Sequence, residues 1–174
     1  MALIETVAAG LKRAMRGIGA PVTIVTAVDG GGRPYAMTAS SFTSVSLCPP
    51  TVLVCVNREA SIHDPLQGGR PFCVNALQTG HRELAVDCAT QGCDSRFADR
   101  AWQLHPLGLP FLADAQAAFF CETLERLEVG THTVLVGVVN EVRTAPDIAP
   151  LIYVDGRFAG VRLASEEDRR SHAR

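Results

Sequence analysis

The chain has 174 residues, a hydrophobic fraction of 47% and a formal net charge of −2. This length suits one domain, and the apolar content excludes global disorder. The slightly acidic balance gives no reason to expect nucleic acid or a membrane as a partner, and no apolar run reaches the roughly 18 residues of a membrane span. Because the N-terminal stretch lacks the pattern of a secretory signal, we expect a cytoplasmic protein.

Apolar residues from Ile4 to Met15 recur at helical spacing, and glycines follow them. They predict an amphipathic helix whose apolar face covers the core. A strand is expected over residues 22–28. Asp29 and three glycines come next, a sequence typical of a hairpin turn.

The most unusual stretch is a block of hydroxyl residues: Thr38, Ser40, Ser41, Thr43, Ser44 and Ser46. After Pro49 and Pro50, residues 51–56 form an apolar run typical of a strand buried on both faces. Serine and threonine in strands commonly face water. Alternatively, these small side chains line a flat slot for a polar aromatic ligand and its phosphate. The residues themselves leave both interpretations open.

Ser61 follows that run at a position where it could cap a short helix. The N-terminus of such a helix, together with Arg58, would favour an anion. A solvated connecting loop is the equally weighted alternative.

The rest of the chain is rich in strand signals. We expect a helix around Leu84 and Cys88, and strands over residues 72–77, 115–127, 132–142 and 151–154. Residues 165–174 form a charged tail beyond a single domain of residues 1–164. Many strands joined by short turns predict a mainly β protein, an antiparallel barrel with peripheral helices.

The six cysteines match no zinc or redox spacing. Cys88 and Cys93, with His81 and His105 nearby, make the single metal-like grouping, and their spacing fits no common zinc pattern. We therefore expect no metal site. Three others lie in strand-like runs and are interpreted as small hydrophobic residues: Cys55, Cys73 and Cys121.

The sequence contains no nucleophile elbow, phosphate-binding loop, zinc-protease motif or dinucleotide fingerprint. Of five histidines, His132 follows a glycine turn at the start of a predicted strand, where its ring could face a pocket. A lone histidine is more often structural, so both interpretations stay open.

The ordered series of motifs nevertheless resembles one known family, the flavin reductases with an FMN-binding split barrel. These proteins are the small reductase partners of two-component flavin monooxygenases. The resemblance covers about residues 8–160. It is carried by residues 38–47, Pro49-Pro50, residues 53–56, Phe72 with residues 74–77, Glu83-Leu84-Ala85, Arg96-Phe97-Ala98 before Trp102, residues 130–133, and residues 150–153 before Gly156.

The resemblance implies a homodimeric split barrel of the Greek-key type. It would bind FMN or FAD together with NADH or NADPH, and pass a hydride from the nicotinamide to the flavin. The reduced flavin would then reach a partner oxygenase. Hydride transfer needs no protein nucleophile, because the reactive atoms belong to the two cofactors. A non-reducing flavin-binding split barrel (a carrier, a sensor or a relative of pyridoxamine oxidase) is the alternative.

The resemblance also assigns roles to residues by position. His132 would position the nicotinamide, with Tyr153 nearby, and Arg82 and Arg96 would meet a phosphate or an adenine. His81 departs from the glutamine that the family often has. The flavin contacts would come from Thr38, Ala39, Ser40 and Ser41 at the ring, from Val56, Asn57 and Ser61 at the ribityl chain and phosphate, and from Asn75, Ala76 and Leu77 along the other side.

Overall fold

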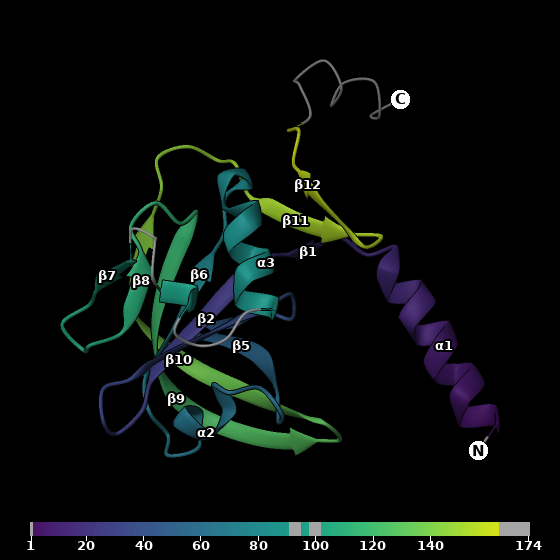
Figure 1. Cartoon of the computed structure of the whole chain (residues 1–174), viewed down its shortest axis with the longest axis horizontal. Coiled ribbons are helices and arrows are strands. Elements are labelled where there is room, and N and C mark those ends of the chain that lie inside the picture. The colour runs from purple at the N-terminus through teal and green to yellow at the C-terminus, as the bar shows by residue number, and fades with distance from the viewer. Residues whose placement is uncertain (1, 91–94, 98–101, 164–174) are drawn as a thin grey trace.

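The computed structural model describes residues 2–90, 95–97 and 102–163. Seven antiparallel strands form its main sheet, in the order β3-β2-β6-β9-β10-β5-β4 (Figure 1). This confirms the mainly β prediction. The bounds are β2 (Thr23–Val28), β3 (Pro34–Ala39), β4 (Thr43–Leu47), β5 (Pro50–Asn57), β6 (Phe72–Ala76), β9 (Ala117–Val129) and β10 (His132–Thr144).

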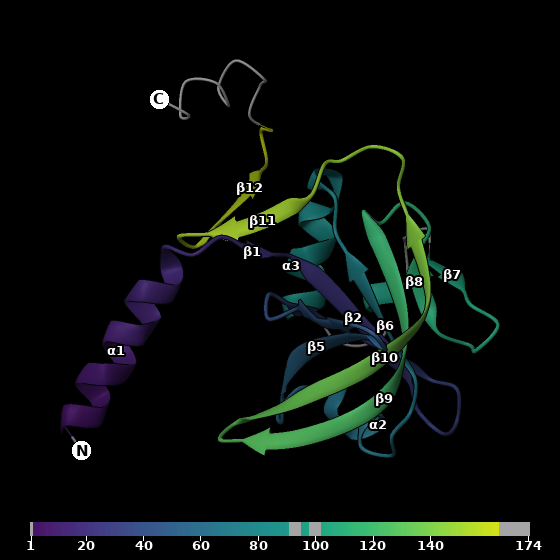
Figure 2. The same ribbon diagram turned by 180° about the vertical axis from the view of Figure 1, so that it is seen from behind.

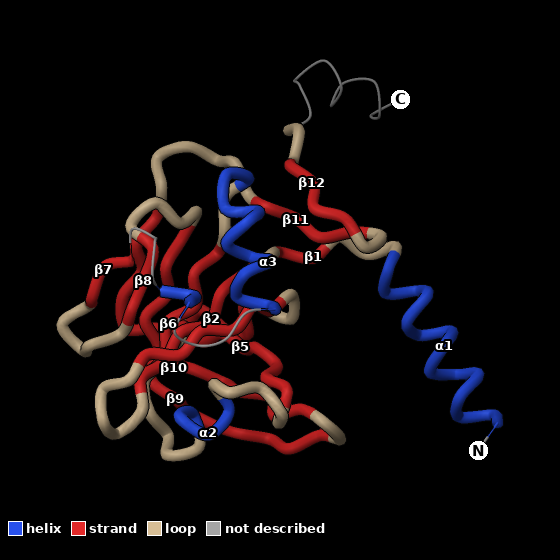
Figure 3. The backbone as a smooth tube through the Cα atoms, viewed as in Figure 1, coloured by secondary structure: helices blue, strands red, loops and turns tan. Residues whose placement is uncertain are grey.

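Two small sheets and a few helices flank the main sheet (Figure 3). The strand β12 was not predicted from the sequence; it pairs with β11 after the turn at Asp155 and Gly156. No described helix is long and apolar enough to cross a membrane. The bounds are β1 (Ala20–Pro21), β11 (Leu151–Val154), β12 (Arg157–Gly160), β7 (Trp102–Leu104), β8 (Pro110–Leu112), α1 (Ala2–Arg16), α2 (His63–Leu66), α3 (Arg82–Thr90), and two 3-10 turns, η1 (Thr79–His81) and η2 (Ser95–Phe97).

The main sheet curls without closing through backbone pairing. Its outer strands are β3 and β4, and β3 also approaches β5. A side chain makes the link there. The Ser41 hydroxyl accepts a hydrogen bond from the Cys55 amide at 2.9 Å and donates to the Cys55 carbonyl at 3.2 Å. The resulting open edge is consistent with a split barrel.

The largest core cluster fills the curled sheet, with Val54, Phe72 and Leu135 at most 1% exposed. Gly137 on β10 makes room for Phe72, because a Cβ atom at that position would lie 2.5 Å from the Phe72 ring. A second cluster packs α3 against the sheet through Leu84, among others. The curled sheet and α3 are therefore one packed body.

The N-terminal helix forms as predicted, but its apolar face does not cover the core. Ile4, Val7 and Leu11 are 62–74% exposed, and α1 projects away from the sheet in both views (Figures 1 and 2). The strands already fill the barrel interior, and the helix is joined to the hairpin β11–β12 by the Arg16–Asp155 ion pair at 2.9 Å. The prediction of core cover is wrong for this chain.

Two local predictions also need correction. The run over residues 51–56, predicted to be buried on both faces, lies in β5, where buried side chains alternate with half-buried ones from Val52 onward. Ser61 does not cap α2, whose first residue is preceded by Ile62 without a side-chain cap. The predicted tail, residues 165–174, lies outside the described residues.

Candidate active site

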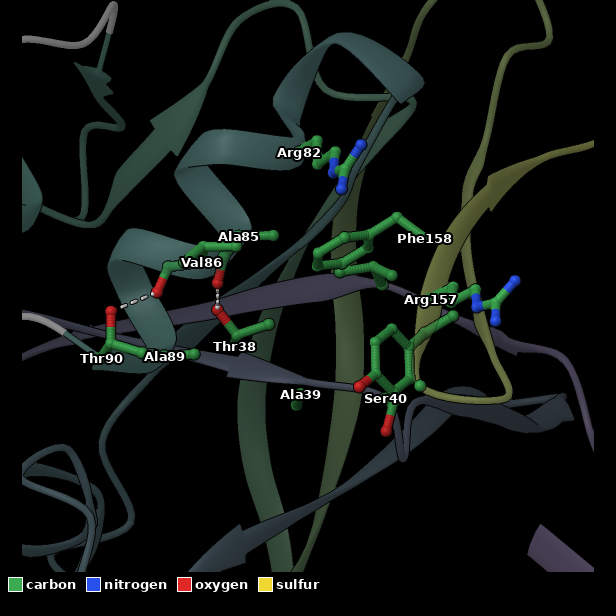
Figure 4. A pocket seen from close by; sticks show the side chains of 13 residues that line it. Thr38, Ala39, Ser40, Arg82, Ala85, Val86, Ala89, Thr90, Arg157 and Phe158 are labelled. Carbon is green, nitrogen blue, oxygen red and sulfur yellow. Dashed lines mark hydrogen bonds between the residues drawn. The ribbon is translucent and has the colours of Figure 1, made fainter. Parts of the chain in front are cut away.

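The C-terminal end of β3 forms a wall shared by several cavities. The largest, here called the α3 cavity, has a volume of about 650 Å³ and lies between β3, α3 and the hairpin β11–β12 (Figure 4). Small side chains make one wall and polar groups stand at its ends, as in sites for flat organic ligands. Its lining includes Thr38, Ala39, Ser40, Arg82, Ala85, Val86, Ala89, Tyr153, Arg157 and Phe158.

Two further cavities share the same wall. The His132 cavity, about 250 Å³, contains His132 and Asn57 beside Thr38, Ala39, Ser40 and Ser41. The Arg96 cavity, about 430 Å³, contains Arg96 and Ser61 beside Thr38. Thr38 lines all three cavities, so the structure brings together segments that are far apart in the sequence.

The hydroxyls of Thr38, Ser40 and Ser41 at this wall differ in their hydrogen bonding. Thr38 donates to the carbonyl of Ala85 in α3 at 2.7 Å, a bond drawn in Figure 4, and so fixes the helix over the strand. Ser41 is fully engaged with Cys55. The exposed Ser40 makes no hydrogen bond with any described residue, which leaves its hydroxyl available to a ligand.

His132 is the first residue of β10 and lies opposite Asn57 of β5. Its Nδ1 atom is 2.9 Å from the hydroxyl of Thr131, and its side chain is exposed. The turn before it contains Gly130 with φ +56°, the left-handed region that favours glycine. The strand starts directly after this turn, and the imidazole lines the His132 cavity, which is the first of the two interpretations left open by the sequence.

Arg96 reaches the wall from η2. Its Nη1 atom donates to the carbonyl of Ala36 and lies 3.5 Å from the hydroxyl of Ser61. The carbonyl of Arg96 accepts a bond from Trp102 Nε1 at 3.1 Å, which anchors this segment. A guanidinium and a hydroxyl at one cavity are suited to a phosphate.

An aromatic pair borders the α3 cavity on the hairpin side. The rings of Tyr153 and Phe158 meet edge to face at 5.3 Å, and the Arg82 guanidinium lies 5.8 Å from the Phe158 ring centre. Figure 4 shows the Phe158 ring pointing toward α3. The cavity therefore combines an aromatic face, a guanidinium group and the hydroxyl of Ser40, which is available to a ligand.

Residues 15–162 match the family model described as a flavin reductase like domain. This chain belongs to the flavin reductase-like family. The NADH:riboflavin 5'-phosphate oxidoreductase of Streptomyces pristinaespiralis is 38% identical over 82% of this chain and 81% of its own. The solved NADH:FAD oxidoreductase of Streptomyces globisporus C-1027, in complex with NAD and FAD fragments, has a TM-score of 0.81 at 34% identity and covers 91% of this chain and 93% of its own. The styrene monooxygenase flavin reductase of Pseudomonas putida S12 has a TM-score of 0.79 at 28% identity, over 89% of this chain and 99% of its own.

Some residues that the resemblance assigned to flavin lie away from the cavities of this flavin reductase-like domain. Val56 and Leu77 are 1% exposed, and Asn75 is fully buried. The Asn75 side chain donates to the carbonyl of Ile24 at 3.1 Å and accepts from the amide of Leu112 at 2.9 Å, which joins β6 to its surroundings. The half-buried Ala76 gives its carbonyl to Gln116 at 2.8 Å. Flavin contacts through the backbone of these residues stay predictions.

The sequence interpretation missed Phe158 and the exposed face of α3, including Val86 and Ala89. The signal for Phe158 was the Asp155-Gly156 turn, which implied a returning strand. No local pattern showed that α3 faces β3, because that contact depends on the bond from Thr38 to Ala85.

His81, which replaces the family's usual glutamine, turns away from this wall. Its Nδ1 accepts from the amide of Gln78 at 3.2 Å, and its Nε2 lies 3.2 Å from Asp114. Within the described ranges no cluster of three ligating side chains could hold a metal ion, and Cys93 lies outside those ranges.

Proposed function

We propose that this chain is an NADH-dependent flavin reductase that supplies reduced FMN or FAD to a separate oxygenase. The observation that carries the proposal is the shared wall: Thr38 lines the α3, Arg96 and His132 cavities, and Ala39 and Ser40 line both the α3 and the His132 cavity. A flavin and a nicotinamide can meet only where two ring sites are continuous. The names of the family relatives support the same reaction.

The α3 cavity fits a flavin in size and chemistry. Its volume of about 650 Å³ lies in the range of sites for small organic ligands, roughly 300–1,000 Å³. Ala39, Ala85 and Ala89 leave a smooth wall for a flat ring. When bound, the flavin supplies the hydride acceptor, so the protein has to bind and align two rings.

The side chains of the wall divide this work. The free hydroxyl of Ser40 donates to the polar edge of the ring system, where it would stabilise negative charge as it develops. Ser61 and Arg96 receive the phosphate at the far end of the ribityl chain, since charge-assisted bonds suit that group. Arg82 is placed to meet the second phosphate of FAD.

His132 aligns the nicotinamide from the His132 cavity, which shares Thr38, Ala39 and Ser40 with the α3 cavity. Its exposed ring is held at Nδ1 by Thr131, and Nε2 has no hydrogen-bond partner among the described residues. It therefore offers one polar atom to an incoming carboxamide. Aligning two reactants at contact distance is itself a large catalytic effect.

We also propose that NADH is favoured over NADPH, because Arg16 and Arg33, two of three arginines that could bind the 2′-phosphate of NADPH, already have other partners; the third is Arg157. Arg16 is paired with Asp155, and Arg33 lies over the Tyr35 ring at 5.7 Å. Arg157 remains at the α3 cavity, away from His132 in the His132 cavity.

We also propose a homodimer located in the cytoplasm. The apolar stripe of α1, with Ile4, Val7 and Leu11 exposed, supports the dimer because such stripes mark protein interfaces. The thiols of Cys48, Cys55, Cys73 and Cys121, which form no disulfide within the described part of the chain, support a reducing compartment.

The test is NADH and NADPH oxidation in air by the purified protein, with FMN, FAD or riboflavin added in turn. We expect NADH turnover that rises and saturates with added flavin. Quenched flavin fluorescence without turnover would favour the non-reducing flavin-binding alternative. No binding of any flavin would refute the proposal.

A further inference from the structure

His63 is a buried histidine that lines none of the three cavities. It begins α2 and is 7% exposed. Its Nε2 atom lies 2.9 Å from the hydroxyl of Thr133, which is itself 2% exposed. Its Nδ1 atom lies 3.5 Å from the side-chain nitrogen of Gln67, which donates to Asp64 at 3.0 Å. Asp64 Oδ1 lies 3.9 Å from the same Nδ1 atom. The hydroxyl of Thr133 can either donate or accept, so it bonds to Nε2 in either tautomer of His63.

This bond connects two segments that carry different parts of the site. His63 ends the loop after β5, which presents Ser61 to the Arg96 cavity. Thr133 follows His132, which faces the His132 cavity. Successive side chains of a strand point to opposite faces, so a bond on Thr133 from the inside fixes the face that His132 presents outside.

The backbones of β5 and β10 are also paired beside these segments, His132 with Asn57 and Thr133 with Val56, and the remaining contacts lie at the surface. The Arg58 amide donates to the Thr131 carbonyl at 3.0 Å, and the Arg58 guanidinium donates to the Gly130 carbonyl at 3.3 Å. Arg58 also lies 3.7 Å from Glu128, with both side chains at least half exposed. Exposed side-chain contacts of this kind contribute little, because water competes for the same groups. Among the side-chain contacts between these segments, the buried bond of His63 is the stronger constraint.

We propose that His63 is a positioning residue that sets the phosphate end and the nicotinamide end of the site together. The inference rests on the proposed function and adds a residue to it. His63 touches neither ligand. It acts through Thr133 on the orientation of His132, and through the loop on the orientation of Ser61.

The test uses the full chain with four variants and two constants, the flavin dissociation constant from fluorescence quenching and the KM for NADH. We expect His63→Ala to raise both constants by about three- to tenfold, the range for losing one buried hydrogen bond. Ser61→Ala should raise only the flavin constant, and His132→Ala only the KM. His63→Gln places an amide nitrogen near the former Nε2 position, so both constants should return most of the way to their wild-type values.

A matched control separates positioning from general stability. His105 is a half-buried histidine whose side chain is 9% exposed; it is bonded to Glu141 at 3.0 Å and lies outside the three cavities. His105→Gln should lower the melting temperature and leave both constants unchanged. If His63→Ala does not fold, Thr133→Val removes the same bond at conserved size and should raise both constants, with Thr133→Ser restoring them.

The results separate failure of the proposed role of His63 from failure of the proposed function. Wild-type protein that turns over NADH, with His63→Ala or Thr133→Val changing neither constant or only one, would overturn the role of His63 and leave the proposed function standing. Wild-type protein that binds no flavin and oxidises no NADH would overturn both.

Discussion

The hydroxyl of Ser41 satisfies both backbone polar groups of Cys55, with bonds of 2.9 Å from the amide and 3.2 Å to the carbonyl. Cys55 lies in β5 beyond the part that pairs with β4. One side chain thus replaces a missing strand at the open edge of the sheet. The adjacent Ser40 has no such duty, although the two residues look alike in the sequence.

We predict that Ser41→Ala lowers the free energy of unfolding. Removing the hydroxyl leaves the Cys55 amide and carbonyl without these partners, which costs roughly 1–3 kcal/mol of unfolding free energy. Urea denaturation measures this loss. Unfolding free energies equal to wild type would show that the link does not hold the edge.

Ser40→Ala is the matched control for Ser41→Ala, because it should weaken flavin binding and leave the stability of the fold unchanged. Because Ser40 is exposed and unbonded within the described chain, we expect the unfolding free energy to stay within about 0.5 kcal/mol of wild type. The flavin dissociation constant should rise by about two- to tenfold, as for one lost hydrogen bond. Fluorescence titration measures the constant, and an unchanged value would remove Ser40 from the flavin site.

Much of this fold could be predicted from local patterns. The turn at Asp29 and the apolar runs of β5, β9 and β10 give strands at the expected places, because alternation and turn residues are local signals. The exposure of α1 could not be predicted, since an amphipathic stripe shows that a helix has an apolar face and does not show what covers it.

The candidate site was predictable only in part. The sequence singled out the hydroxyl block by its density and His132 by the glycine turn before it, and Thr38, Ser40, Ser41 and His132 line one cavity. Their roles toward flavin and nicotinamide stay predictions. Asn75 was assigned to flavin by position, yet its side chain joins β6 to Ile24 and Leu112. Phe158 was missed, because its place beside Thr38 depends on contacts between segments 120 residues apart in the sequence.

A further prediction concerns acid pH. The Glu141 carboxylate accepts bonds from His105 at 3.0 Å and Arg143 at 2.7 Å, and these bonds lower its pKa below the ordinary value of 4.5. A pKa that is lower in the folded state gives stability that is present above the unfolded pKa and lost as the pH falls through the folded one.

We therefore expect the unfolding free energy of the wild type to fall more steeply than that of Glu141→Gln between about pH 5 and pH 3. Urea titrations at a series of pH values make the comparison. Parallel curves for the two proteins would show that the His105–Glu141–Arg143 group contributes nothing to acid sensitivity.

Gly137→Ala should disturb the middle of the barrel. The added Cβ would lie 2.5 Å from the Phe72 ring and 3.0 Å from Cys121, both buried. Overpacking of this kind costs roughly 1–3 kcal/mol. The control is Gly10→Ala in α1, where nothing lies within 4 Å and helix propensity should add roughly 0.5–1 kcal/mol. Thermal unfolding of both variants tests this, because the melting temperature should fall for Gly137→Ala and rise for Gly10→Ala. A Gly137→Ala protein as stable as the wild type would contradict the packing argument.

The stripe on α1 yields a prediction about assembly. Replacing Ile4, Val7 and Leu11 with serine removes the apolar contact surface and should convert a dimer to a monomer in light scattering. Serine at Leu104 and Leu107, which are also exposed but lie at β7 and its following turn, should leave the mass unchanged. A dimer that survives the triple substitution would assign the interface to another surface.

This chain moves a hydride from NADH to a flavin. The most direct measurement is an anaerobic mixture of FMN and a molar excess of NADH with a small amount of the protein, followed by the visible absorbance of oxidised flavin. We predict that the absorbance disappears at a rate proportional to the protein concentration. With His132→Ala it should disappear more slowly at NADH concentrations below the KM. Flavin that stays oxidised although its fluorescence is quenched by the protein would contradict the claim.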